Sequence, residues 1–124
     1  MNIPTQFTLF GNTIKVRIEN IDLDGGTYGY WNDVTNEIFL FRQVKIDGQV
    51  HNLTRKQIDH TFWHELRHAM QYYSLGETDE QDAQTFASMM TEFMESSRNQ
   101  TYTQEPQDLF QLTDIVYTPN PTES

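Results

Sequence analysis

Residues 61–70 of this 124-residue chain are Thr61-Phe62-Trp63-His64-Glu65-Leu66-Arg67-His68-Ala69-Met70. This stretch contains the pattern His-Glu-x-x-His. Residues four positions apart lie one above the other on an α-helix, so His64 and His68 can offer two imidazole nitrogens to one metal ion. Glu65 lies about 100° further round the helix, where it can contact a water beside the ion without being a ligand. The stretch therefore predicts a metal centre in which Glu65 is the catalytic general base.

The flanking sequence predicts that the motif lies on a helix over residues 55–75. Thr54-Arg55-Lys56-Gln57 has the form of an N-terminal capping box, and Gly76 is a typical residue to end a helix. The apolar residues recur at three- and four-residue steps: Ile58, Phe62, Leu66, Ala69 and Tyr73. We therefore expect this helix to pack on a sheet through one face, with the two histidines at the border between core and cleft.

A second helix is predicted from Thr78-Asp79-Glu80-Gln81, which repeats the capping-box pattern, to about Arg98. Its apolar face would contain Ala83, Phe86, Ala87, Met90, Phe93 and Met94. Glu80 falls in the first turn, on the face that carries Ala83 and Ala87, and small residues on that face would let the two helices approach closely. This arrangement would bring the Glu80 carboxylate within reach of both histidines.

Two histidines and one carboxylate leave one position of a tetrahedral zinc ion open for water, which is typical of a catalytic site. The predicted cofactor is Zn2+, and the predicted ligands are His64, His68 and Glu80. His60 is an alternative third ligand, but three histidines on successive turns converge on one ion only if the helix bends. The competing carboxylates lie off the alanine face: Glu77 and Asp79.

Three further side chains near the motif are open to two interpretations. His51 precedes the helix and is either a loop residue or a donor to an oxyanion. Tyr72 and Tyr73 could also donate to a tetrahedral intermediate, although packing in the core or at its rim is the commoner role of such tyrosines. None of the three is included among the predicted site residues.

The N-terminal half of the chain predicts short strands. A hairpin is expected with a turn at Gly11-Asn12 and with Ile14, Val16 and Ile18 facing the core. A turn-rich segment at 22–27 follows, and residues 44–50 form either a hairpin or a loop. The predicted strands are Phe7–Phe10, Thr13–Glu19, Tyr28–Trp31 and Glu37–Phe41. The predicted fold class is α+β, with a small twisted N-terminal sheet packed on two helices in a single domain at 1–98 and a polar, loosely ordered tail at 99–124.

Composition restricts the function further. The chain has no cysteine, which excludes disulfides, a thiolate nucleophile and a cysteine-based zinc site. Its 18 acidic and 8 basic residues give a net charge of −10, and the basic residues do not cluster, so binding to nucleic acid is disfavoured. The sequence shows no secretory signal and no apolar stretch long enough to span a bilayer, so we expect a cytoplasmic protein without a membrane partner.

With His64-Glu65-Leu66-Arg67-His68 followed by Glu80-x-x-Ala83-x-x-Phe86-Ala87, the chain resembles the small ImmA/IrrE-type zincin metallopeptidases of phages and mobile elements. The resemblance extends over residues 5–97 and includes the hairpin and strands ahead of the motif. It implies a minimal, gluzincin-like fold, and it implies that Glu80 is the third zinc ligand. Asp82 could serve as a hydrogen-bonding residue behind a ligand or as a surface residue. The segment Met89–Met94 departs from the family, which has a leucine-rich, proline-ended extension there.

Three functions are compatible with these residues. The favoured one is a zinc metalloendopeptidase that hydrolyses a peptide bond in a protein or peptide, with a host or phage transcriptional regulator as one candidate substrate. Its substrate would lie extended along an edge strand at Glu37–Phe41. The second is an acidic interaction protein, an anti-repressor or DNA mimic, with a structural or vestigial zinc site. The third is zinc that only stabilises helix packing.

Overall fold

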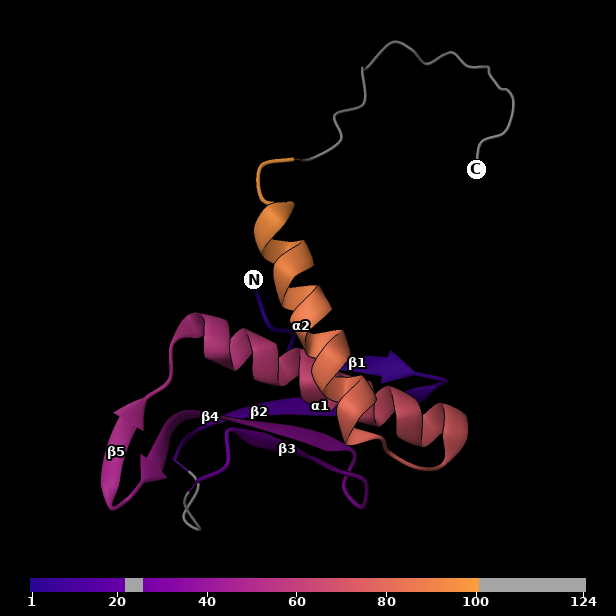
Figure 1. The fold of residues 1–124 in the computed structure, drawn as a ribbon. Coiled ribbons are helices and arrows are strands. Elements are labelled where there is room, and N and C mark those ends of the chain that lie inside the picture. Colours follow the sequence, from indigo (N-terminus) through magenta and orange to yellow (C-terminus); the bar gives the residue numbers. More distant parts are fainter. Residues whose placement is uncertain (22–25, 101–124) are drawn as a thin grey trace.

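The computed structural model describes residues 1–21 and 26–100, and these form an α+β fold in which a five-stranded mixed sheet is packed against two C-terminal helices (Figure 1). In chain order the elements are β1 (Gln6–Leu9), β2 (Asn12–Ile21), β3 (Gly29–Asn32), β4 (Glu37–Ile46), β5 (Gln49–Asn52), α1 (Arg55–Leu75) and α2 (Glu80–Ser96). Most of the predicted turn at 22–27, and the predicted tail from residue 101 onward, lie outside the described residues.

Strand β4 is the central strand of the sheet. The strand order is β1-β2-β4-β3, β5 also pairs with β4, and only the β2–β4 pair is parallel. Ile38 of β4 therefore has Val16 of β2 on one side and Trp31 of β3 on the other. The prediction that Glu37–Phe41 is an edge strand is wrong. The unbroken apolar run at 38–41 is instead typical of an inner strand whose side chains are covered on both faces of the sheet.

Two of the predicted turn regions are hairpins. The β1–β2 turn is Phe10-Gly11, one residue earlier than predicted, with φ angles of 49° and 78°. The β4–β5 turn is Asp47-Gly48, so the segment at 44–50 is a hairpin and not a loop. Of the three residues expected to face the core, Ile14 and Val16 are buried, but Ile18 is 39% exposed because it lies in a shallow groove beside the first turn of α1.

Helix α1 begins and ends where the local signals predicted. The Thr54 side chain accepts a hydrogen bond from the Gln57 backbone, and the Gln57 side chain accepts one from the Thr54 backbone, which completes the capping box. Gly76 ends the helix with a φ of 80° and donates its N–H to the Tyr72 carbonyl. The helix packs on β3 and β4 over a core formed by Ile14, Val16, Ile38, Leu40, Phe62 and Ala69.

Gly29, the first residue of β3, allows a close approach between the sheet and α1. A Cβ atom at this position would lie 2.5 Å from the Phe39 carbonyl oxygen and 2.8 Å from Cγ2 of Thr61 on α1. Both separations are shorter than van der Waals contact, so only glycine fits without displacing its neighbours. The close approach brings the edge strand β3 against the helix one turn before His64.

Helix α2 packs across α1 and then projects away from the body of the molecule (Figure 1). Its N-cap is Asp79, which accepts from the Asp82 backbone, so the predicted cap at Thr78 is wrong by one residue.

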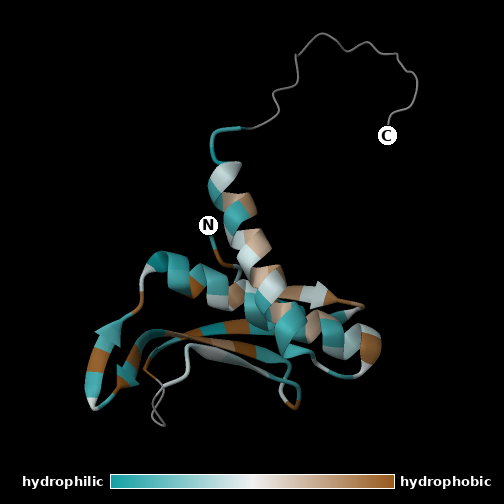
Figure 2. Cartoon of the chain, viewed as in Figure 1, coloured by the Kyte–Doolittle hydropathy of each residue, from teal (hydrophilic) through white to brown (hydrophobic). Residues whose placement is uncertain are grey.

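Ala83 and Ala87 are fully buried against α1, as their small size predicted. Apolar residues also recur along the projecting half (Figure 2), and Phe93, predicted to lie on the apolar face, is 58% exposed. Within the described residues, no helix has the length and apolarity needed to cross a membrane.

Candidate metal centre

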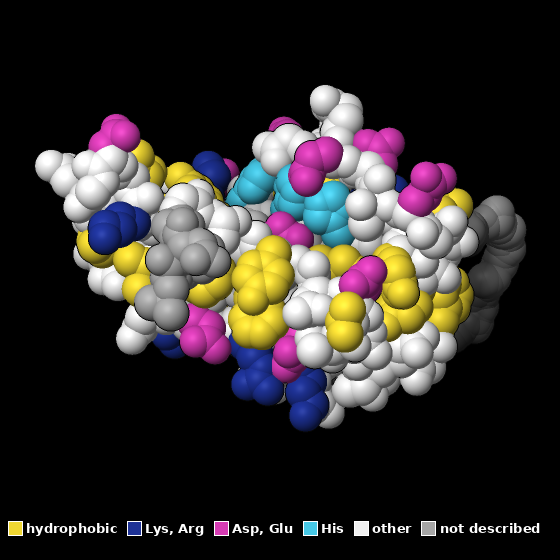
Figure 3. All heavy atoms as spheres, turned by 90° about the horizontal axis from the view of Figure 1, so that it is seen from below, with side chains coloured by type: hydrophobic (Ala, Val, Ile, Leu, Met, Phe, Trp, Pro, Cys, Tyr) yellow, Lys and Arg dark blue, Asp and Glu magenta, His cyan; other side chains and the backbone are white. Residues whose placement is uncertain are grey.

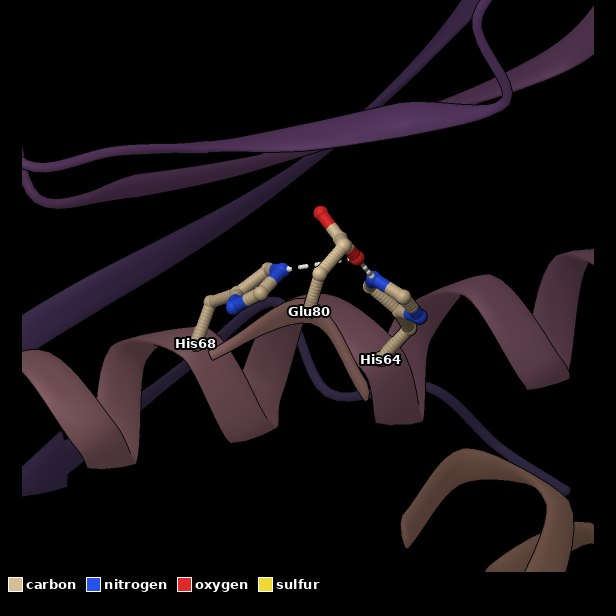
Figure 4. Close-up of side chains that lie close together, drawn as sticks. All are labelled: His64, His68 and Glu80. Atoms are coloured by element: carbon tan, nitrogen blue, oxygen red, sulfur yellow. Dashed lines mark hydrogen bonds and ion pairs between the residues drawn. The ribbon is translucent and has the colours of Figure 1, made fainter. Parts of the chain in front are cut away.

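Three side chains from two helices converge at one point. His64 and His68 come from the middle of α1, Glu80 is the first residue of α2, and one carboxylate oxygen of Glu80 lies between the two imidazoles (Figure 4). Oε1 of Glu80 is 2.5 Å from Nε2 of His64 and 3.3 Å from Nε2 of His68. The histidine side chains are 15% and 10% exposed, whereas that of Glu80 is 77% exposed, so the group is open to solvent on the α2 side.

The donor set fits a zinc ion. One ligand atom from each of the three residues lies within 4.8 Å of the others, and ligand atoms of an ideal tetrahedral zinc site with nitrogen and oxygen ligands are about 3.3 Å apart. Small side-chain rotations would remove the difference. Two imidazole nitrogens and a carboxylate oxygen are also the atom types that zinc prefers when no cysteine is present. The three predicted ligands therefore form a group that could hold a metal ion.

Glu65 lies beside this group, at the interface between α1 and the sheet. It is 7% exposed, and its carboxylate accepts a hydrogen bond from the Trp31 backbone on β3. Burial raises the pKa of Glu65 above its ordinary value; Glu80 acts in the same direction, while His64 and the other neighbouring groups lower it. A bound divalent cation would add a further influence that favours the charged carboxylate. Glu65 is thus held in place from the strand side without being one of the three converging ligands.

The site opens into a cavity of about 420 Å³ between α1 and the segment that leads into β3. Figure 3 shows histidine side chains gathered around this hollow, with acidic side chains on either side of them. The lining residues are Thr27, Tyr28, Gly29, His60, Thr61, His64, Glu65, Glu80 and Gln84. The cavity therefore places the converging ligands, Glu65 and the edge strand around one volume.

A layer of glutamine side chains lies behind the histidines. Nδ1 of His64 is 3.2 Å from Oε1 of Gln84, and Nδ1 of His68 is 3.0 Å from Oε1 of Gln71. Asp82 accepts hydrogen bonds from both Gln71 and Arg67, and the two contacts lower the pKa of Asp82, that from Arg67 more strongly. Asp82 thus contacts His68 only through Gln71, and its side chain is 43% exposed, so it combines a hydrogen-bonding role with a place at the surface.

The other candidate residues lie elsewhere or have other roles. His60 lines the cavity one turn before His64, but it is not part of the converging group. His51 lies on the exposed strand β5 and does not line the cavity. Asp79 caps α2, and Tyr73 donates its hydroxyl hydrogen to the Asn36 side chain. The remaining candidates, Glu77 and Tyr72, are also outside the converging group.

Sequence reasoning missed three contributors to the site. Gln71 follows His68 by three positions, and Gln84 follows Glu80 by four, so helical spacing could have indicated both. The backbone of Trp31 could not have been found in this way, because its contact with Glu65 depends on how β3 is placed against α1.

Comparisons of the chain with protein families, with curated proteins and with solved structures give no match.

Proposed function

We propose that this protein is a zinc-dependent metallopeptidase that hydrolyses a peptide bond in a protein or peptide substrate, on a minimal zincin-like fold. The observation that carries the proposal is the convergence of His64, His68 and Glu80 with the buried carboxylate of Glu65 beside them, all around one cavity. A purely structural zinc site is usually closed by four protein ligands, whereas this group offers three and is open toward the cavity.

His64, His68 and Glu80 would hold the metal. Zinc, when bound, supplies a Lewis acid that acidifies water and polarises a carbonyl oxygen. Glu65 takes the proton from the attacking water and passes it to the departing amine, so that it acts first as a base and then as an acid. The hydrogen bond from the Trp31 backbone fixes the direction of the Glu65 carboxylate. The contacts behind the two histidines hold their rings in place.

The substrate would bind along β3. One edge of this strand pairs with β4, and within residues 1–21 and 26–100 no strand pairs with the other edge. Tyr28 and Gly29, at the start of that edge, line the same cavity as the ligands. An extended peptide can add to a strand edge through backbone hydrogen bonds. On the outer edge of β3 the Gly29 carbonyl already accepts from Thr27 and the Trp31 backbone already faces Glu65, so the peptide would use the groups that remain. In this arrangement its scissile carbonyl would lie over the metal group, and β3 takes the role that had been predicted for Glu37–Phe41.

The first test is the metal content of the purified protein, measured by elemental analysis without chelators. We expect one zinc per chain in the wild type and in Glu65→Gln, and loss of zinc in His64→Ala and Glu80→Ala. Matched controls are His51→Ala and Glu77→Gln, which change the same residue types outside the converging group. Zinc retained in Glu80→Ala would reject the proposed ligand set.

The second test is cleavage of a mixture of synthetic peptides of varied sequence, followed by mass spectrometry. The wild type and both controls should cleave, whereas Glu65→Gln should bind zinc and lose cleavage by a factor of about 10² or more, since it lacks the general base. Full cleavage by Glu65→Gln would reject the mechanism. Zinc binding without cleavage of any peptide, or of cellular protein extracts, would favour metal-stabilised packing instead.

A further inference from the structure

Gln71 is the most constrained polar side chain near the metal group. It lies on α1 one turn after His68, is 5% exposed, and its carboxamide contacts both α1 and the start of α2. Oε1 is 2.9 Å from the Asp79 backbone nitrogen and 3.0 Å from Nδ1 of His68. Nε2 is 3.1 Å from the Asp79 carbonyl oxygen and 2.7 Å from Oδ2 of Asp82.

These four contacts determine which way the amide faces. The backbone nitrogen of Asp79 can only donate a hydrogen bond, and its carbonyl oxygen can only accept one. The Asp82 carboxylate, which Arg67 also contacts, is an acceptor as well. The amide oxygen must therefore face the Asp79 N–H, and the amide nitrogen must face the two acceptors. With its oxygen fixed on that side, Gln71 can only accept a hydrogen bond from His68.

We infer that Gln71 is a positioning residue that fixes the tautomer of His68. Because its Nδ1 must donate to Gln71 at 3.0 Å, neutral His68 carries its proton on Nδ1 and has a lone pair on Nε2 for a metal ion. In the metal-free protein the Glu80 carboxylate competes for a proton on Nε2, but its contact is longer, at 3.3 Å. The same amide clamps both backbone groups of Asp79, the residue immediately before Glu80. The uncharged Gln71 side chain thus acts on two of the three proposed ligands. It sets which nitrogen of His68 carries the proton, and it holds the start of α2, which carries Glu80.

Gln84 provides an internal comparison. It also faces a ligand histidine, His64, through Oε1, but it is exposed and lies at the cavity, one turn after Glu80 on α2. Within residues 1–21 and 26–100, no backbone pair fixes its amide as Asp79 fixes that of Gln71. Gln84 can therefore turn to suit either tautomer of His64, and its removal should have a smaller effect than removal of Gln71.

The inference rests on the proposed metal site but not on peptidase activity, and its main test uses metal-free protein. The imidazole ¹⁵N chemical shifts of His68 and His64 would be measured at pH 8.5 in the presence of a chelator. For the wild type, and for Glu80→Ala, in which no carboxylate faces Nε2, we expect His68 with its proton on Nδ1. Gln71→Met, of similar volume but without hydrogen bonds, should move His68 toward the Nε2-protonated form and leave His64 unchanged. Gln84→Met should leave His68 unchanged.

The variant Gln71→Glu separates the effect of Gln71 on the His68 tautomer from its effect on the position of α2. A carboxylate can still accept the His68 proton but cannot donate to Asp79 or Asp82, so we expect the tautomer to be retained while zinc binding weakens. The zinc dissociation constant, measured by competition with a chromophoric chelator, should rise about 10- to 100-fold in Gln71→Met and less in Gln84→Met. Backbone amide spectra confirm that each variant is folded.

Two outcomes would overturn the inference: a wild-type His68 protonated on Nε2, or a folded Gln71→Met variant whose His68 tautomer is unchanged. The peptidase proposal can fail separately, through absence of cleavage, while the tautomer and zinc results still support the role of Gln71.

Discussion

At the scale of single residues, the molecule tolerates an unfavourable conformation at one turn and depends on the absence of a side chain at another position. Phe10 is 80% exposed and has a φ of 49°, a region that non-glycine residues other than Asn and Asp rarely adopt. Gly29 lies where even a methyl group would contact the Phe39 carbonyl and Thr61. Phe10 affects only the stability of the β1–β2 turn, whereas Gly29 affects the placement of the edge strand β3 at the site.

Replacing Phe10 by Asn should stabilise the protein by roughly 0.5–1 kcal/mol, since Asn adopts a positive φ at lower cost and little packing is lost at so exposed a position. Chemical denaturation would measure the change in the free energy of unfolding. Val34→Asn is the control, because Val34 is 88% exposed and its φ is not positive. A gain of equal size in the control would show that exposure alone, not the backbone, is responsible.

Gly29→Ala should lower the free energy of unfolding by about 1–3 kcal/mol, as is typical of overpacking, and should weaken zinc binding by moving β3 away from α1. Combining it with Thr61→Ser removes the Cγ2 atom that the new methyl group would contact but keeps the hydroxyl bond to the Gln57 carbonyl. The double variant should recover part of the loss. If the double variant were no more stable than Gly29→Ala, Cγ2 of Thr61 would not be the atom that the new methyl group displaces.

At the scale of elements, local signals predicted the ends of α1 correctly, while partners distant in the sequence could not be predicted. The capping box at 54–57 and Gly76 act within one turn of the helix, so they are visible in sequence. The cap of α2 was misplaced by one residue because Thr78 and Asp79 are both good caps, and contacts with Gln71 select Asp79. The central position of β4 depends on a parallel pairing with β2, for which no short motif exists.

One ion pair supports that parallel pairing and makes it sensitive to pH. Arg17 of β2 donates to the Glu37 carboxylate at the start of β4, and this hydrogen bond, followed by one from Thr35, lowers the pKa of Glu37 below its ordinary value of 4.5. A carboxyl whose pKa is lower in the folded state stabilises that state at higher pH, and the contribution is lost as pH falls through the lowered pKa.

Glu37→Gln should therefore lower the melting temperature at pH 7, and the difference from wild type should shrink as the pH falls below 4.5. We expect a modest effect, because Arg17 is largely exposed and solvent screens the pair. Glu92→Gln, an exposed change on α2, is the control for altered net charge. A difference that stays constant from pH 7 to pH 3 would contradict this account of the pair.

At the scale of the whole molecule, the sequence predicted the fold class and the converging ligand group but not the environment of the group. His64, His68 and Glu80 could be found because helical spacing and two small residues, Ala83 and Ala87, brought them together. The edge strand, the cavity and the contact between Trp31 and Glu65 arise from how β3 lies against α1. These depend on tertiary packing, which no local pattern records.

Because the three proposed ligands lie on two helices, metal binding should stabilise the whole fold. At a zinc concentration 100 times the dissociation constant, the expected gain is about 2.7 kcal/mol. Removing zinc with a chelator should lower the melting temperature of the wild type and speed amide hydrogen exchange in the first turns of α2. The variant Glu80→Ala should show neither change. An equal chelator effect in Glu80→Ala would place the stabilising metal elsewhere.

The position of Glu80 on the last described element also bears on how the protein matures during synthesis. The chain emerges from the ribosome N-terminus first, and a domain generally folds as a unit. The sheet and α1, with its histidine pair, contain the main core and are complete by residue 75. The third ligand follows five residues later, and α2 must then dock on α1 through its alanines. A nascent chain would thus lack the third proposed ligand until α2 had left the ribosome, so the proposed metal group could not be complete before then.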